Sequence, residues 1–154
     1  MRAYVFIRGG EIRLDGTDTK VWTQIVIQNF GKTPGYDFET WTNIQIDNPI
    51  NPPFDKRGVP AQKSIIGPGA DLNVPSQAIA ISPAEHADIK SGKKVIIVWG
   101  EAAYRDAFKN KVTFVFRSIN SKNEVVVSDN ATGRTIWHGW GLQPHSTGYE
   151  ERKG

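Results

Sequence analysis

Apolar and polar residues alternate along several runs of this chain, and this alternation restricts its fold more than any other feature. In residues 20–30, every second side chain is apolar or β-branched, from Val21 to Ile27. Residues 36–47 and 111–119 repeat the pattern. Side chains of a strand point alternately to opposite faces, so the period of two predicts strands with one buried and one wet face, as in antiparallel sheets. Shorter strands are expected at 3–8, 11–14, 64–66, 77–81, 95–104, 124–127 and 132–140.

One short helix is expected over residues 82–91. Ser82 is a typical N-cap, Pro83 suits the first helical position, and Glu85 completes a capping box. Gly92 is a typical C-cap. In contrast, residues 48–62 contain four prolines, which remove hydrogen-bond donors from a sheet, so this stretch predicts a long loop.

Short strands with one brief helix predict an all-β fold, and we expect an immunoglobulin-like antiparallel two-sheet sandwich with one short helix. The sandwich domain is expected to span residues 1–142, and residues 143–154 are expected to form a flexible tail. Asn120 to Asn123 is expected to be a hairpin turn. Gly100, inside an apolar strand, predicts either a bulge or a close approach of backbones.

Composition argues against several functional classes. The chain has no cysteine, which excludes disulfides, thiolate metal sites and a cysteine nucleophile. Its net charge of +3 comes from basic residues scattered singly or in doublets, so no nucleic-acid footprint is expected. The three histidines have no ligand spacing to one another, so no metal site is expected. We expect no cofactor, and no residues form a catalytic constellation.

Residues 22–119 resemble a bacterial protein family. The resemblance is carried by three segments, which are Asn29–Pro34, Ile65–Gly69 and Trp99–Phe108. Members of this family are small membrane-anchored proteins in which one or two transmembrane helices and a helical linker precede a segment beginning Arg-Ala-Tyr, as at Arg2 to Tyr4 here. The resemblance implies that this chain is the soluble part of a membrane-associated protein, on an undefined side of the membrane. It brings no known activity, cofactor or catalytic residue.

Two tryptophans are candidate binding residues because they fall on the polar faces of their strands. Trp22 and Trp41 would form an exposed aromatic platform if their strands were neighbours. The structural alternative is a cross-strand aromatic pair, or an indole covered by the proline-rich loop.

Four further residues are weighed as partner contacts. Glu101 and Arg105 are a candidate recognition pair, whereas the structural alternative is an ion pair between Arg105 and Asp106 that holds the following turn. Trp137 and Trp140 flank a glycine near the end of the chain, and are either an aromatic contact for an oligomer or part of a last strand.

The sequence therefore predicts a non-enzymatic interaction domain that binds a protein partner or itself, displayed by an N-terminal membrane anchor. The alternative is a sandwich that binds a carbohydrate or another small ligand through Trp22, Trp41 or Trp140. A third hypothesis, an enzyme with its site in the proline-rich loop, locates no acid–base pair.

Overall fold

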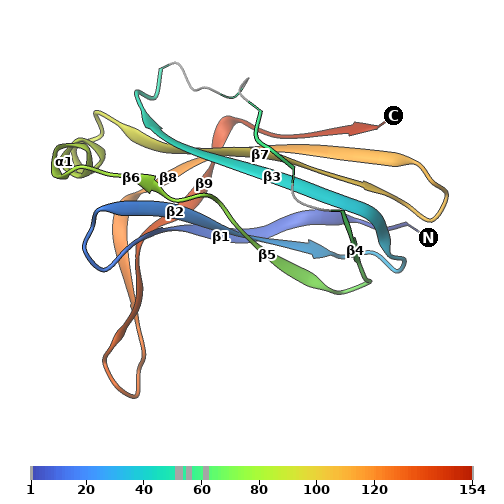
Figure 1. Cartoon of the computed structure of the whole chain (residues 1–154), viewed down its shortest axis with the longest axis horizontal. Coiled ribbons are helices and arrows are strands. Elements are labelled where there is room, and N and C mark those ends of the chain that lie inside the picture. The colour runs from blue at the N-terminus through green and yellow to red at the C-terminus, as the bar shows by residue number, and fades with distance from the viewer. Residues whose placement is uncertain (1, 51–53, 55–56, 61–62, 154) are drawn as a thin grey trace.

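The chain folds into one antiparallel sheet that curls and nearly closes into a barrel (Figure 1). The computed structural model describes residues 2–50, 54, 57–60 and 63–153. Within these residues the sheet has nine strands, of which eight follow the order β4-β3-β7-β8-β9-β1-β2-β5 and the ninth, β6, pairs with β2. The elements are β1 (Val5–Leu14), β2 (Lys20–Asn29), β3 (Gly35–Asp47), β4 (Ser64–Ile66), β5 (Asp71–Pro75), β6 (Ile79–Ala80), α1 (Pro83–Ser91), β7 (Val95–Arg105), β8 (Lys111–Ser128) and β9 (Thr135–Lys153).

The predicted alternation places the core correctly. Val21, Thr23, Ile25 and Ile27 of β2 are all buried, and the residues between them are half-buried. The main core lies inside the curled sheet and joins the three apolar side chains among these to Phe38, Ile96, Val98, Phe114 and Trp140. Because burial of apolar area is the dominant favourable term in folding, this interior is what holds the sheet in its curled form.

Two long strands carry the sheet around its curve. The first part of β8 pairs with β7, whereas the β8–β9 pairing alone continues to Ser128. The β8–β9 ladder shifts register between Phe116 and Ser118 and again between Asn120 and Glu124. Extra residues at such bulges bend a strand and increase its twist, so β8 and β9 can serve both sides of the interior.

Some expected boundaries differ from the structure. Asn120 to Asn123 is a bulge within the continuous strand β8, where the sequence suggested a hairpin turn. Residues 143–153, expected to form a tail, pair with β8 as the second part of β9. Residues 3–8 and 11–14, expected as two strands, lie almost entirely in β1, which contains one register shift near Gly9. The expected strand at 77–81 is reduced to β6, and β5 was not anticipated.

The short helix and the glycine of β7 follow local rules. Ser82 and Glu85 form the expected capping box of α1, and Gly92 ends the helix in the left-handed conformation. The ladder runs through Gly100 without a register shift. A Cβ atom there would lie 2.1 Å from the carbonyl oxygen of Trp41, so the close approach is confirmed and the bulge is not.

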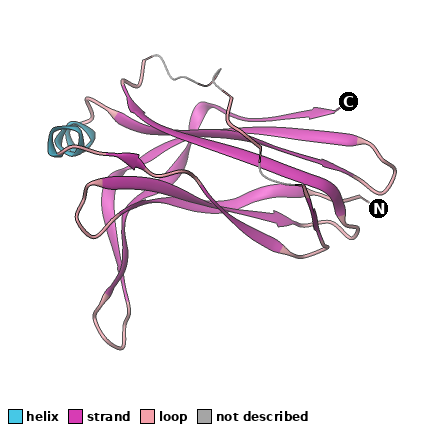
Figure 2. Ribbon diagram, viewed as in Figure 1, coloured by secondary structure: helices cyan, strands magenta, loops and turns pink. Residues whose placement is uncertain are grey.

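A second apolar cluster lies on the outer face of β3 and β7. It contains Trp41, Ile97 and Trp99, against which Phe54 packs. The predicted loop at 48–62 is only partly described, and the described residues of this stretch contain no strand or helix (Figure 2). In the part of the chain that the structure describes, no helix is long and apolar enough to cross a bilayer.

Candidate functional site

Two tryptophans and an arginine lie on one outer face of the sheet, across β2, β1 and β9. Arg13 is the register partner of Trp22, and its guanidinium carbon lies 5.5 Å from the centre of the Trp137 ring. Glu11, on the same face of β1, accepts hydrogen bonds from Arg13 Nε at 3.0 Å and Nη2 at 2.7 Å. We call Trp22, Arg13 and Trp137 the aromatic–arginine strip. Both indoles are half-buried, and the guanidinium is held in place by a carboxylate and a ring.

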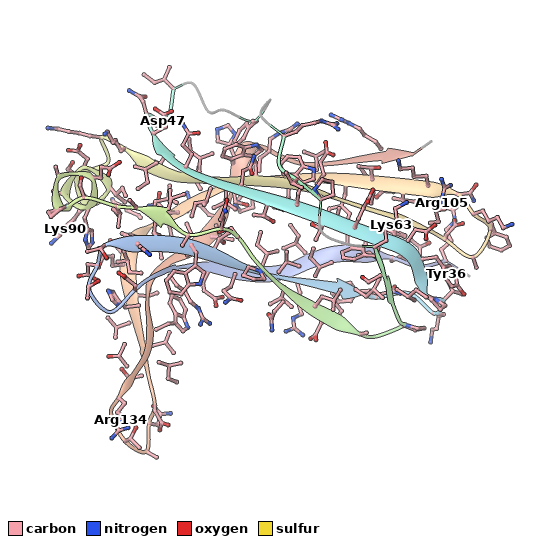
Figure 3. All side chains as sticks on the ribbon, in the orientation of Figure 1. Tyr36, Asp47, Lys63, Lys90, Arg105 and Arg134 are labelled. Carbon is pink, nitrogen blue, oxygen red and sulfur yellow. The ribbon has the colours of Figure 1, made fainter. Side chains whose placement is uncertain are left out.

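The strip continues into a hairpin that projects from the body. We use hairpin for Glu124–Ser128 of β8 with Thr135–His138 of β9, which extends at the lower left of Figure 1. Figure 3 labels Arg134 at its tip. Val127 is the register partner of Trp137, so the valine extends the strip by one strand. On the opposite face of the hairpin, Val126 is 64% exposed and Ile136 is 61% exposed.

The hairpin also has an edge with few partners. In the described residues, Val125 to Ser128 pairs with β9 and with no other strand. Backbone groups of an antiparallel strand point alternately to its two sides, so this edge offers N–H and C=O groups away from β9. Val125, Val126 and Val127 are β-branched and exposed, which favours pairing with a further strand.

Trp41 and Glu101 lie elsewhere, on the outer face of β3 and β7. Trp41 is only 8% exposed, and a Cβ atom on Gly58 would lie 2.8 Å from its ring, so the segment around Gly58 covers the indole. Trp22 and Trp41 therefore form no common platform, because β2 and β3 are not paired. Glu101 forms an ion pair with Arg57, at 3.2 Å, rather than with Arg105.

Trp140 belongs to the core and not to a surface. It is 1% exposed and is the register partner of Ile12. Its ring makes an edge contact with the imidazole of His86, which in turn pairs with Glu124. Beside this pair, α1, the β1–β2 turn and the bulge of β8 enclose a cavity of about 840 Å³. Stacking on a sugar requires an exposed indole face, which neither Trp140 nor Trp41 offers.

Arg105 lies at the opposite end of the molecule, and Figure 3 shows it near Tyr36. Its Nε atom is 3.8 Å from Asp37, and its Nη1 donates to the carbonyl of Lys109 at 3.2 Å. The anticipated partner of the turn, Asp106, instead accepts hydrogen bonds from Phe108 and Asn110. The aspartate beside Arg105 is therefore Asp37, and Asp106 holds the turn through hydrogen bonds rather than through an ion pair with Arg105.

Sequence reasoning found the two indoles of the strip but missed the residues that connect them. Arg13 has no special local context, and its position between Trp22 and Trp137 depends on pairing β1 with both β2 and β9. The exposed valines carried a signal, since Val125 to Val127 is a run of three β-branched residues. His86 lies half-buried against Trp140, a contact between distant parts of the chain that its local sequence does not indicate.

No family model, no curated protein and no solved structure matches this chain.

Proposed function

We propose that this chain is a non-enzymatic interaction domain that binds a protein partner by adding a strand to the Val125–Ser128 edge of the hairpin. The observation that carries the proposal is an edge that no strand among the described residues covers and that bears three exposed valines. Exposed, apolar edge strands are templates for pairing with another chain, and folded proteins usually cover or charge them. A second copy of the chain is the simplest partner.

The aromatic–arginine strip supplies side-chain contacts beside this edge. In strand addition the backbone provides affinity, and pockets for alternate side chains provide specificity. Val125, Val127 and Trp137 lie on the same face of the hairpin as Arg13. Tryptophan and arginine are enriched among the residues that contribute most to protein interfaces. A partner strand paired with this edge would place alternate side chains beside Val125 and Val127, on the same face as the aromatic–arginine strip.

The groups with shifted pKa values support a structural rather than a catalytic role. Burial raises the pKa of Tyr104, whose hydroxyl donates to the carbonyl of Ala3. Desolvation alone would raise the pKa of Asp15 and Asp106. Hydrogen bonds from groups in the same turns outweigh it, so the pKa of each carboxyl is lowered. Each of these groups holds a chain segment in place. A carboxyl whose pKa is shifted by the hydrogen bonds of a turn does not by itself indicate acid–base catalysis.

The proposal includes two expectations from the sequence. The domain is taken as an immunoglobulin-like sandwich, supported by a core that lies between β1 and β2 on one side and β3, β7 and β8 on the other. The full-length protein is taken as membrane-associated, on the basis of the family resemblance. Carbohydrate binding remains the alternative, and of the three tryptophans offered for it, Trp22, Trp41 and Trp140, only Trp22 is not buried.

Replacing Val126 with lysine tests the proposal. A charge on the edge blocks strand addition without removing a core side chain, so Val126→Lys should weaken self-association by roughly tenfold or more, equivalent to about 1.4 kcal/mol. Trp137→Ser should weaken it less, because the backbone pairing remains. Sedimentation velocity over a wide range of concentrations measures both effects.

Ile50→Lys is the matched control, because Ile50 is also exposed and apolar but lies in the turn that follows β3, away from the hairpin. It should associate like the unmodified chain. A wild-type chain that remains monomeric at every attainable concentration would contradict the pairing of two copies. Equal weakening by Val126→Lys and Ile50→Lys would show that the edge is not the contact.

A further inference from the structure

The exposed aromatic side chains gather at the end of the molecule opposite α1. Among the described side chains, the large aromatic ones that are exposed are Tyr4, Phe30, Tyr36 and Phe108. All four come from this end, which we call the amino-terminal pole, where Figure 1 places both chain ends. Phe30 donates its backbone N–H to the carbonyl of Tyr4, and its ring lies 6.4 Å from that of Phe6. None of these four side chains belongs to the main core.

Basic residues surround these aromatic side chains. Arg2, Arg105, Lys109 and Lys111 line a cavity of about 580 Å³ together with Tyr4 and Tyr104. Lys32 is exposed on the neighbouring β2–β3 connection. The acidic side chains at the pole are fewer: Asp37 lies beside Arg105, Glu151 lines the cavity, and Asp106 is occupied by its own turn. The pole is therefore cationic, although the chain as a whole carries only +3.

The turn between β7 and β8 holds one aromatic and one basic residue at its tip. Asp106 accepts hydrogen bonds from the backbone N–H groups of Phe108 and Asn110, both at 2.9 Å. Lys109 has a φ of 65°, an uncommon conformation for a residue with a side chain. Phe108 is 67% exposed. The turn is thus built firmly around Asp106, while the phenylalanine at its tip buries little of its own surface.

We propose that the amino-terminal pole docks on the headgroup region of an anionic phospholipid bilayer. Cationic side chains near such a surface each contribute about a fivefold gain in binding. Aromatic side chains favour the boundary between headgroups and acyl chains, where an apolar ring and a polar edge are both satisfied. The cavity between Arg2, Arg105 and Lys109 is suited to a phosphodiester headgroup, because guanidinium and ammonium groups are its usual partners.

The arrangement favours a bilayer over other large anions. The aromatic residues come from four separate segments that meet at one pole: the amino-terminal segment, the β2–β3 connection, the start of β3 and the β7–β8 turn. A broad, soft surface can contact several such tips together. Single-stranded nucleic acid requires a continuous groove with stacked bases, and a protein hot spot requires a packed centre surrounded by a rim.

Vesicle binding by the 154-residue chain tests the proposal. We expect cosedimentation with vesicles of phosphatidylcholine and phosphatidylglycerol, little with phosphatidylcholine alone, and a loss of binding as salt is raised. Lys109→Asn should reduce partitioning about fivefold, because asparagine tolerates the left-handed conformation and only the charge is lost. Phe108→Ser should also reduce it, and circular dichroism should show both variants folded.

Lys122→Asn is the control for charge and Val126→Lys for the hairpin, since both residues lie far from the pole. Lys122→Asn should partition like the unmodified chain, and Val126→Lys should not partition less, whatever the result of the self-association experiment. Equal binding to neutral and anionic vesicles would overturn the proposal. Binding to a single-stranded oligonucleotide as tight as to anionic vesicles would overturn it in favour of a nucleic-acid site.

Discussion

At the scale of single residues, Asn29 joins the two edges of the curled sheet. Its side-chain oxygen accepts hydrogen bonds from the backbone N–H of Tyr4 and Gly31, and its amide donates to the carbonyls of Thr33 and Ile66. Its backbone bonds the turn between β4 and β5 through Ala70 and Gly69. Asn29 is fully buried, and its amide makes four hydrogen bonds.

Asn29→Ala should therefore destabilise the protein strongly. The substitution leaves buried backbone groups without partners, and each such group costs about 1–3 kcal/mol. We expect a loss of about 2–4 kcal/mol in the free energy of unfolding, measured by urea denaturation. Gln28→Ala, next in sequence on the half-buried outer face, should cost less than about 1 kcal/mol. Similar losses in the two variants would contradict the role assigned to Asn29.

The bonds of Asn29 also explain the structural role of the segment Asn29–Pro34. A Cβ atom on Gly31 would lie 2.2 Å from the carbonyl oxygen of Arg2, so only glycine allows the β2–β3 connection to reach the amino-terminal segment. The motif Asn29–Pro34 therefore serves to close the sheet. Local sequence does not identify the partners of this segment, since Ile66 and Arg2 are distant from it in the chain.

At the scale of elements, the β1–β2 turn is organised by one carboxylate. Asp15 accepts hydrogen bonds from the backbone N–H of Thr19 and Lys20 and from the hydroxyls of Thr17 and Thr19. Desolvation alone would raise the pKa of Asp15, but these hydrogen bonds outweigh it and lower the pKa from 3.8 to about 2. The charged form is thus favoured in the folded protein.

Stability should consequently fall in acid. A carboxylate whose pKa is depressed on folding contributes stability that is present above its unfolded pKa and is lost as pH falls through the folded value. For Asp15 this window runs from 3.8 down to about 2. Asp15→Asn should flatten this part of the curve of unfolding free energy against pH. Asp106, whose pKa is also lowered, should preserve some slope. Identical slopes in both proteins would contradict the assignment.

Elements with complete local signals were predictable, and elements defined by distant partners were not. Helix α1 carries its own caps at Ser82 and Gly92, and β2 carries an uninterrupted alternation. The bulge after Asn120 depends on a remote group, because the side-chain oxygen of Asn120 accepts a hydrogen bond from the backbone N–H of Ile96. The local sequence there favours a turn, and the pairing with β9 overrides it.

At the scale of the whole molecule, β8 and β9 hold the curled sheet together. Outside the projecting hairpin both strands pair with the rest of the sheet: β8 pairs with β7, and β9 pairs with β1 through residues 138–141 and with the start of β8 through residues 149–153. Val112, Phe114 and Phe116 of the main core lie in the part of β8 that this last segment pairs. The final residues are therefore expected to contribute to folding.

A chain that ends at Leu142 should be less stable than the complete one. Removing the second part of β9 exposes the edge of β8 next to three core side chains, and a loss of several kcal/mol is expected from such a cut. Thermal unfolding followed by circular dichroism measures it, with a chain ending at Arg152 as control. Equal melting temperatures of the complete chain and the chain that ends at Leu142 would support the flexible tail that the sequence suggested.

Each candidate surface is assembled from several segments that are distant in the chain, so only some of its residues could be predicted from the sequence. Trp22 and Trp137 were identified from the sequence, but the arginine between them is placed by two different strand pairings. Arg105 was identified too, whereas the pole around it gathers residues from the amino-terminal segment, the β2–β3 connection, the β7–β8 turn and the end of β9. Trp41 has the outward position that alternation assigns, and only the segment around Gly58 buries it.

The pairing at the carboxyl end determines how the molecule would respond to mechanical load. Lys153 is the register partner of Val112, so the end of β9 lies at the start of its ladder with β8. A force on this end, directed across the strands, would break the hydrogen bonds of the ladder one register pair at a time. A pull along the strands would instead load many hydrogen bonds together. Resistance to tension should therefore depend on direction, with peeling the weaker mode.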